Sequence, residues 1–286
     1  MGIILSSDSL CDLTEEIKKE NQIHTISYHI ILDGKDYIDG RDISPDELFR
    51  AYQERDILPR TAAVNVGEYV SYFQPWVEQG HEIIHFCLGS SLTSSYQNCL
   101  LAAETLGHIT VIDSGSLSGG IGLQLLDCRQ MIDAGKTPAE ITRYFEENRA
   151  KYHASFILDT LDFLRAGGRC SALVALSACL LSIKPEIVVH PEDGSMSVGN
   201  KFRGNFEKVV GKYVKHKLEQ YPDMKTDKII LAYAGPEHDM IDKVYQMVKE
   251  ANLFEKIYII RASCTICSHC GPGTIGIFLE TESNCA

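Results

Sequence analysis

Serine and threonine hydroxyls are concentrated in loops of the first half of the chain, at the ends of predicted strands or before a predicted helix. These loops are Ser6–Ser9, Pro59–Asn65, Gly89–Ser95 and Asp113–Ser118. Hydroxyls and the free backbone amides of helix N-termini bind anions, and a carboxylate or a phosphate would fit equally well. Each loop taken alone is also explained by helix capping and turn formation. Several such loops at one edge of a sheet indicate a binding site.

Three longer side chains in the second half of the chain are suited to an anion. His269 precedes the Gly271-Pro272-Gly273 turn and could donate a hydrogen bond to a carboxylate, although a solvent-facing loop histidine is an equal alternative. Arg169 and Arg203 could each clamp an anion. Exposed ion pairs are the simpler explanation for a lone arginine.

Three cysteines, Cys264, Cys267 and Cys270, follow one another at a spacing that resembles part of an iron–sulfur ligand set. Zinc bound by these cysteines and His269 is also conceivable. A closed site needs a fourth ligand, for which Cys285 is the candidate. The alternative is a loop of reduced cysteines. A metal or redox protein is therefore a second hypothesis, with these three residues as weak candidates.

Two other kinds of chemistry find little support. The glycine-rich segment Gly115–Gly122 matches neither the dinucleotide-binding pattern nor the ATP-binding loop, and no Gly-Lys-Ser/Thr follows it. The Gly-x-Ser-x-Gly pattern of many serine hydrolases is absent from the sequence. A self-sufficient hydrolase or transferase that uses Thr93 or Ser95 as its nucleophile remains a third hypothesis.

The composition limits the partners. The 286 residues carry a formal charge of −12, which disfavours nucleic acid as a partner. No apolar run approaches the ~18 residues of a membrane span, and no signal peptide is evident, so we expect a cytoplasmic protein without stable membrane insertion. In that compartment the ten cysteines are expected to be reduced. Cys11, Cys87, Cys99, Cys128 and Cys179 are predicted to be core residues.

The elements that would position these residues alternate between strand and helix. The predicted strands of the first half are 3–5, 24–32, 35–38, 82–88 and 109–112, and the predicted helices are 13–21, 66–79, 95–107, 119–134, 138–152 and one that begins at Ser44-Pro45. This order predicts a parallel, Rossmann-like sheet with helices on both faces. Ligands of such sheets lie beyond the carboxyl ends of the strands.

The second half of the chain lacks the regular strand–loop–helix repeat of the first half. We therefore place a domain boundary near residue 155, which gives an N-terminal α/β domain (1–155) and a C-terminal α/β domain with a mixed sheet (156–286). An apolar segment runs from Cys170 to Ile183. Residues 186–190 and 196–201 predict a hairpin. The remaining predicted elements are helices 206–220 and 238–251 and strands 229–234, 257–262 and 274–279. No flexible linker marks the boundary, so the domains are expected to pack closely.

Short motifs in a fixed order make the chain resemble the DegV family, whose characterised members include the fatty-acid-binding subunit of bacterial fatty acid kinase. The motifs are Ser7-Asp8-Ser9, Asp12-Leu13, Leu92–Gln97, Val111–Ser114, Leu161–Ser171, Ile183-Lys184-Pro185, Lys201–Arg203 and His269–Gly273. The sequence departs from the family pattern at Ala62–Val64, at Ser94 in place of a glycine, and in the cysteine-rich Cys264–Cys270 segment.

The resemblance implies a fatty-acid-binding protein and not a complete enzyme. A long acyl chain would lie in an apolar tunnel between the two domains, and no other cofactor is implied. Thr61, Thr93 and His269 would hydrogen-bond the carboxylate, with Ser94 beside them. A separate ATP-dependent fatty acid kinase would phosphorylate that carboxylate to an acyl phosphate. Arg169 and Arg203 match family arginines that would balance charge or dock the kinase.

Overall fold

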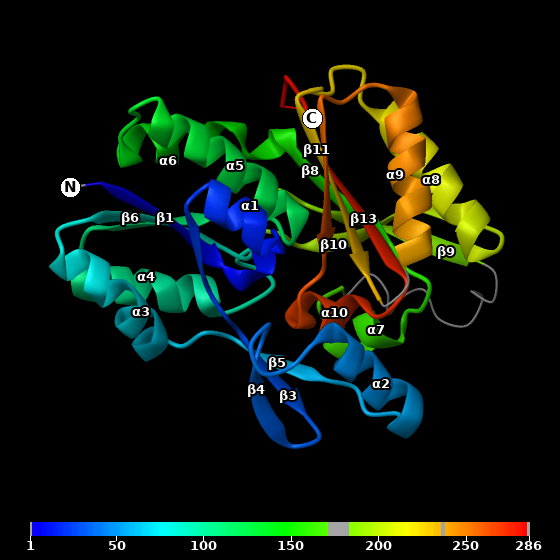
Figure 1. The fold of residues 1–286 in the computed structure, drawn as a ribbon, viewed down its shortest axis with the longest axis horizontal. Helices are drawn as coiled ribbons and strands as arrows, with labels where there is room; N and C mark the ends of the chain where they lie inside the picture. The colour runs from blue at the N-terminus through cyan, green and yellow to red at the C-terminus, as the bar shows by residue number, and fades with distance from the viewer. Residues whose placement is uncertain (1, 171–182, 236–237, 285–286) are drawn as a thin grey trace.

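Two large sheets and one small sheet form the frame of the protein in a computed structural model that describes residues 2–170, 183–235 and 238–284 (Figure 1). Several predictions lie outside these residues. They are the interior of the apolar segment 170–183, the core position of Cys179, the end of the motif at Ser171, and Cys285 as a fourth metal ligand.

The first sheet is entirely parallel, with strand order β2-β1-β6-β7. Helices α3 and α4 lie on one face, and α1, α5 and α6 lie on the other (Figure 1). The predicted parallel sheet with helices on both faces is therefore confirmed. The bounds are β1 Ile3–Asp8, β2 Ile23–Ile26, β6 Glu82–Cys87, β7 Ile109–Asp113, α1 Glu15–Glu20, α3 Val66–Glu78, α4 Ser95–Leu106, α5 Gly119–Asp133 and α6 Pro138–Asn148.

The second sheet is mixed, with order β10-β9-β8-β13-β11-β12, and only β11 and β12 pair in parallel. Helices α8 and α9 cover its outer face (Figure 1). The predicted mixed sheet and the hairpin of β9 and β10 are confirmed. The bounds are β8 Tyr152–Ile157, β9 Ile183–Val189, β10 Met196–Arg203, β11 Lys228–Ala234, β12 Lys256–Arg261, β13 Thr274–Glu280, α8 Phe206–Gln220 and α9 His238–Ala251.

Helix α5 lies between the two large sheets, contacting β1 on one side and β8, β11 and β13 on the other. Its residues from Gly119 to Cys128 are all buried. A Cβ atom at Gly119 would overlap the side chains of Phe278 and Ile230. The glycine-rich start of α5 therefore serves close packing.

The small antiparallel sheet has the order β4-β3-β5 and lies beside α2, α7 and α10 (Figure 1). Helix α2 begins as predicted: the Ser44 hydroxyl accepts a hydrogen bond from the Glu47 backbone N–H, the Glu47 carboxylate accepts one from the Ser44 backbone N–H, and Pro45 fills the first turn. The bounds are β3 His29–Leu32, β4 Lys35–Ile38, β5 Arg60–Ala62, α2 Pro45–Arg55, α7 Asp162–Gly167 and α10 Cys264–Cys270, with 3-10 turns at Ser9–Cys11 and Arg149–Lys151.

Four element predictions are wrong. The predicted strand 24–32 is two strands, because β2 pairs with β1 whereas β3 pairs with β4 and β5 in another sheet. The polar loop 59–65 contains strand β5, the cysteine-rich loop 264–270 is helix α10, and the helix predicted from Pro138 to Tyr152 ends at Asn148. Strand β8 crosses the boundary predicted near residue 155, and the division into 1–155 and 156–286 stays a prediction.

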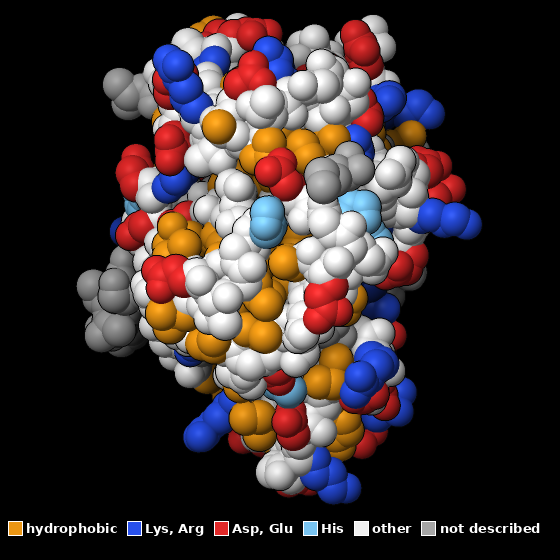
Figure 2. All heavy atoms as spheres, turned by 90° about the vertical axis from the view of Figure 1, so that its left-hand side faces the viewer, with side chains coloured by type: hydrophobic (Ala, Val, Ile, Leu, Met, Phe, Trp, Pro, Cys, Tyr) orange, Lys and Arg blue, Asp and Glu red, His pale blue; other side chains and the backbone are white. Residues whose placement is uncertain are grey.

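One hydrophobic cluster runs from the first sheet through α5 to the inner face of the second sheet, and a second cluster lies under α8 and α9. Cys11, Cys87, Cys99 and Cys128 are buried, as predicted. No helix within the described ranges has both the length and the hydrophobicity that a transmembrane span requires. On the face drawn in Figure 2, acidic and basic side chains are interspersed, and no continuous basic surface is visible.

Candidate functional site

A cavity of about 190 Å³ lies where the small sheet, the loop before α4 and helix α10 meet. Thr61 comes from β5, Thr93 and Ser94 precede α4, and His269 lies in the last turn of α10. Arg169, which follows α7, completes the rim. Ser94 and Arg169 are exposed, so this end opens to solvent. We call Thr61, Thr93, Ser94, Thr265 and His269 the headgroup cluster.

Six residues were predicted to bind the carboxylate, to balance its charge or to dock the kinase, and the structure brings five of them together around this cavity. Arg203 is the exception: it is exposed on β10 and does not line the cavity. Sequence reasoning missed Thr265 and Tyr28, which both line the cavity. Thr265 lies four residues before His269, a helical spacing that would have pointed to it had the segment been predicted as a helix.

Thr61 and His269 are joined by a hydrogen bond, with 2.9 Å between Oγ1 and Nε2. The other ring nitrogen, Nδ1, is buried and has no partner among the described residues. A buried N–H without an acceptor is costly, so we assign the ring hydrogen to Nε2. His269 then donates to Thr61, whose own hydroxyl hydrogen is free to donate to a ligand.

Burial, reinforced by the nearby charge of Arg169, lowers the pKa of His269 to about 4. The imidazole is therefore neutral at pH 7 and acts as a single N–H donor. A neutral donor can bind a carboxylate without the desolvation cost of a second buried charge.

Thr93 has a local partner in the helix that follows it. Its hydroxyl lies 3.2 Å from Ser95 Oγ, and the Ser95 backbone N–H donates back to Thr93 Oγ1. Ser95 Oγ also accepts from the backbone N–H of Val64. Within the described parts of the chain, no histidine or carboxylate bonds either hydroxyl.

A second, apolar cavity of about 50 Å³ adjoins the first along the inner face of the mixed sheet. Four residues line both cavities: Leu117, Met196, Ile266 and His269. The inner cavity is lined further by small and aromatic side chains, including Ala232, Ala234, Gly276, Phe156 and Phe278. The hydroxyl-rich end therefore continues into an apolar interior.

Two carboxylates from the first half of the chain hold the start of α10. Asp39 accepts from the backbone amides of Cys264 and Thr265 at 2.9 and 2.8 Å, and Asp12 accepts from that of Ser263 at 3.0 Å. These amides have no partner inside the helix, and negative charge is favourable at a helix N-terminus. The helix that carries Thr265 and His269 is thereby fixed against the N-terminal half.

A second polar cluster lies directly behind the cavity, centred on the fully buried carboxylate of Asp8. Asp8 accepts from Tyr69 at 2.6 Å, Tyr28 at 3.0 Å, the Leu88 backbone at 2.9 Å and His85 at 3.3 Å. We call this set the Asp8 cluster: Ser6, Asp8, Tyr28, Tyr69, Tyr72 and His85.

The other hydroxyl-rich loops serve the fold. Ser7 bonds the Phe86 carbonyl, Ser114 bonds the Ser116 carbonyl, and Ser118 bonds Asp12. Of the loops predicted to form an anion site, Gly89–Ser95 and Pro59–Asn65 supply hydroxyls to the headgroup cluster.

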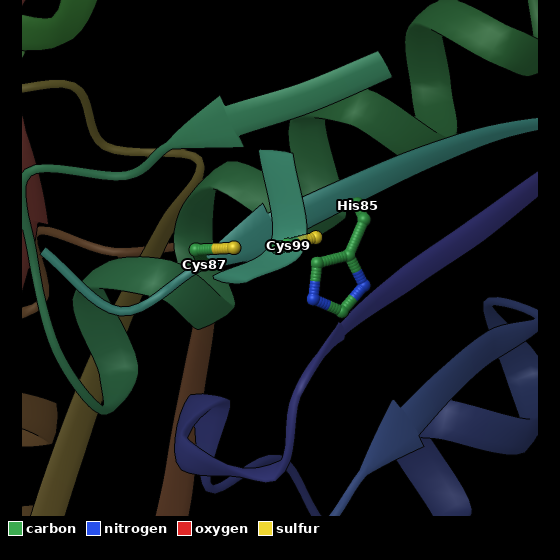
Figure 3. A group of neighbouring side chains, drawn as sticks. All are labelled: His85, Cys87 and Cys99. Atoms are coloured by element: carbon green, nitrogen blue, oxygen red, sulfur yellow. The ribbon is translucent and has the colours of Figure 1, made fainter. Parts of the chain in front are cut away.

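His85, Cys87 and Cys99 form a buried group of potential metal ligands, with ligand atoms within 4.8 Å of one another (Figure 3). Both ring nitrogens of His85 are already used, since Nδ1 lies 2.9 Å from Ser6 Oγ and Nε2 bonds Asp8. Burial and the neighbouring Cys99 raise the pKa of the Cys87 thiol well above its ordinary value. These contacts explain the group as core packing.

The cysteines predicted as metal candidates are buried along α10. The thiols of Cys264, Cys267 and Cys270 each approach a different backbone carbonyl, those of Ile43, Ala262 and Gly271. Burial raises the pKa of Cys264 and of Cys267, which favours the thiol form of both side chains. Among the described residues these three do not form a group of converging metal ligands.

Comparison with known sequences finds one family across the chain. The family described as uncharacterised protein, DegV family, matches residues 3–282. A DegV domain-containing protein of Clostridium perfringens is 29% identical, over 98% of this chain and 99% of the relative.

Solved structures agree with this match. A DegV family protein from Thermus thermophilus, whose structure is described in terms of fatty acid binding, superposes with a TM-score of 0.90 at 25% identity, covering 98% of this chain and 100% of that one. DegV from Bacillus subtilis, described as a fatty acid binding protein, has a TM-score of 0.84 at 21% identity, covering 99% and 100%. The second likeness shows the fold alone.

Proposed function

The chain belongs to the DegV family, as its motifs predicted, and from this premise we propose that it binds a long-chain fatty acid and presents the carboxylate to a separate kinase. The kinase would use ATP to convert the bound carboxylate to an acyl phosphate. The protein itself would supply binding and orientation, and the fatty acid would be its ligand in place of any cofactor.

The observation that carries the proposal is the pair of adjoining cavities. A hydroxyl-lined cavity that opens to solvent shares Leu117, Met196, Ile266 and His269 with an apolar one. A fatty acid has the same division, with one charged end and a long apolar chain. Each CH₂ that leaves water contributes about 0.8 kcal/mol, so the acyl chain would supply most of the affinity.

The headgroup cluster matches the needs of a carboxylate. An ionised carboxylate taken from water requires several hydrogen-bond donors. Thr61, Thr93, Ser94 and His269 all line the outer cavity. The neutral state of His269 suits it to donate through Nε2 once a ligand oxygen replaces or joins Thr61 as acceptor.

The kinase would approach at the solvent-exposed rim. Arg169 lies there, with Nη1 bonded to the Gly167 carbonyl at 2.7 Å. Its charge would offset the negative charge that gathers as a phosphoryl group reaches the carboxylate. Arg203, exposed outside the cavity, suits a docking role better than contact with the ligand. The use of ATP makes the cytoplasm the expected compartment.

The ligand is tested by native mass spectrometry of the freshly purified protein, with lipid extraction alongside. We expect one fatty acid per chain and at least tenfold weaker binding of added palmitate in Thr61→Val and Thr93→Ala, because each removes a hydrogen bond to a charged group worth roughly 1.5–3 kcal/mol. Thr105→Ala is the matched control, since that hydroxyl bonds only the Leu101 carbonyl on an exposed part of α4. A purified protein that holds no fatty acid and takes up no palmitate would refute the proposal.

The division of labour with a kinase is tested separately. Protein loaded with labelled palmitate is incubated with Mg-ATP and hydroxylamine, which traps acyl phosphates as hydroxamates. We expect no hydroxamate from the loaded protein alone and formation after the catalytic subunit of a bacterial fatty acid kinase is added. Hydroxamate formed without the added kinase would make the protein an enzyme in its own right.

A further inference from the structure

Thr265 carries a buried hydroxyl that has no hydrogen-bond partner among the described residues. The residue is 4% exposed, and Oγ1 is one of the few buried side-chain atoms left unpaired. An unpaired hydroxyl in a protein interior costs roughly 1–3 kcal/mol. Such atoms are uncommon in native proteins and call for an explanation.

The helix itself cannot satisfy this hydroxyl. A threonine within a helix usually bonds the carbonyl four residues earlier, but for Thr265 that residue is Arg261, which lies in β12. Ser268, one turn further along α10, does reach its helical acceptor, at 2.7 Å from the Cys264 carbonyl. The backbone N–H of Thr265 is held by Asp39, so the residue is fixed in place.

The position of Thr265 points to a ligand. It lines the outer cavity with Thr61, Thr93 and His269 but does not line the apolar one. Because Thr265 and His269 are four residues apart on α10, their side chains share one face of the helix. The unpaired hydroxyl therefore lies at the polar end of the cavity.

We propose that Thr265 Oγ1 donates a hydrogen bond to the carboxylate of the bound fatty acid. This inference rests on the function proposed above and adds a binding residue to it. A carboxylate offers about four lone-pair positions. Thr61, Thr93 and His269 can occupy three of them. Ser94 is exposed at the rim, and Thr265 supplies a buried donor for the fourth.

The test replaces the hydroxyl by a methyl group of similar shape. We expect Thr265→Val to bind palmitate roughly tenfold more weakly than the unchanged protein, because a hydrogen bond to a charged group is lost. The ligand-free variant should be at least as stable in urea, because an unpaired buried hydroxyl has been removed. Thr265→Ser should keep its affinity. A loss of affinity without a loss of stability is not expected of a residue that only supports the fold.

Ser268→Ala is the matched control, since its hydroxyl already bonds the helix backbone. It should lower stability and leave palmitate affinity within about twofold. A second measurement uses palmitate methyl ester, which lacks the charged acceptor. The difference in affinity between Thr265→Val and the unchanged protein should be smaller for the ester than for palmitate.

The outcomes separate the two proposals. If the unchanged protein does not bind palmitate, the proposed function fails. If it binds but Thr265→Val binds equally well, or if the difference is as large for the methyl ester, the assignment of Thr265 to the carboxylate fails.

Discussion

The Asp8 cluster and the headgroup cluster are neighbouring groups of polar side chains, and Tyr28 connects them. Tyr28 lines the cavity, and its hydroxyl donates to Asp8. Both clusters contain a histidine and several hydroxyls. Composition alone would not tell which of them binds a ligand.

The two clusters differ in how completely their polar atoms are paired. In the six residues of the Asp8 cluster, no buried side-chain nitrogen or oxygen lacks a hydrogen-bond partner. In the headgroup cluster, Thr265 Oγ1 and His269 Nδ1 both lack one. A closed network stabilises the fold, whereas an unpaired hydroxyl beside a cavity, such as that of Thr265, is available to a ligand.

The histidines of the two clusters have opposite pKa shifts. Burial opposes the charged form of His85, but the Cys87 sulfur and the hydrogen bond to Asp8 outweigh it and raise the pKa to about 9. Within the part of the chain that the structure describes, His269 has no carboxylate partner, and burial and Arg169 lower its pKa to about 4. Protonation of His85 thus stabilises the fold below its unfolded pKa, and that contribution is lost as pH rises through about 9. For His269 the fold favours the neutral form, so its contribution to stability is present above pH 6.5 and is lost as pH falls toward 4.

The largest expected effect comes from opening the closed network. Asp8→Asn places an amide group among donors that need an acceptor, and we expect the free energy of unfolding to fall by about 3–5 kcal/mol in urea denaturation. Asp36→Asn is the matched control: this exposed carboxylate also bonds a histidine, His29, and should change stability by less than about 1 kcal/mol. If Asp8→Asn kept its stability but lost palmitate binding, Asp8 would belong to the ligand site and the distinction between the clusters would break down.

A second prediction uses the pH dependence of His269. Its folded pKa of about 4 lies below the ordinary 6.5, so it contributes stability above pH 6.5 that is lost as pH falls toward 4. Between about pH 7.5 and pH 5, the ligand-free protein should lose about 2 kcal/mol more stability than His269→Gln, which has no such titration. Urea denaturation at both pH values measures the difference. A variant that loses as much as the unchanged protein would mean that His269 is charged in the fold and is not a neutral donor.

Elements with strong local signals were predictable. The bounds of α8 agree with the predicted helix 206–220, and the capping residues of α2 form the expected bonds. Strand β5 was not predictable in this way, because Thr61 pairs with Ile30, far away in the sequence. Helix α10 was missed for another reason. It has seven residues, most of them buried, so it shows no polar face from which a helical period could be read.

The residues of the candidate site divide in the same way, into those with a signal in the sequence and those that can be recognised only in the fold. Thr93 and His269 were predicted because they lie in motifs of a known family, and Thr61 because it keeps the family residue just before the departure at Ala62–Val64. Thr265 depends on the missed helix, and its unpaired hydroxyl can be recognised only when the surrounding acceptors are in place. Arg203 matched a family position, but the fold carries it along β10 away from the cavity rim.

The smallest expected effect tests how the open cluster is held. Gly167 packs against His269, and a Cβ atom there would overlap Nδ1 of the ring. Gly167→Ala should therefore displace the imidazole and weaken palmitate binding about tenfold, or about 1.4 kcal/mol, while the added methyl suits the backbone of α7. Gly211→Ala in α8 is the matched control, since the nearest atom to its Cβ is 3.9 Å away and no cavity residue is touched. It should keep its affinity and gain slightly in stability. Unchanged binding in Gly167→Ala would show that the position of His269 does not govern the headgroup site, and the cluster would then depend on its threonines alone.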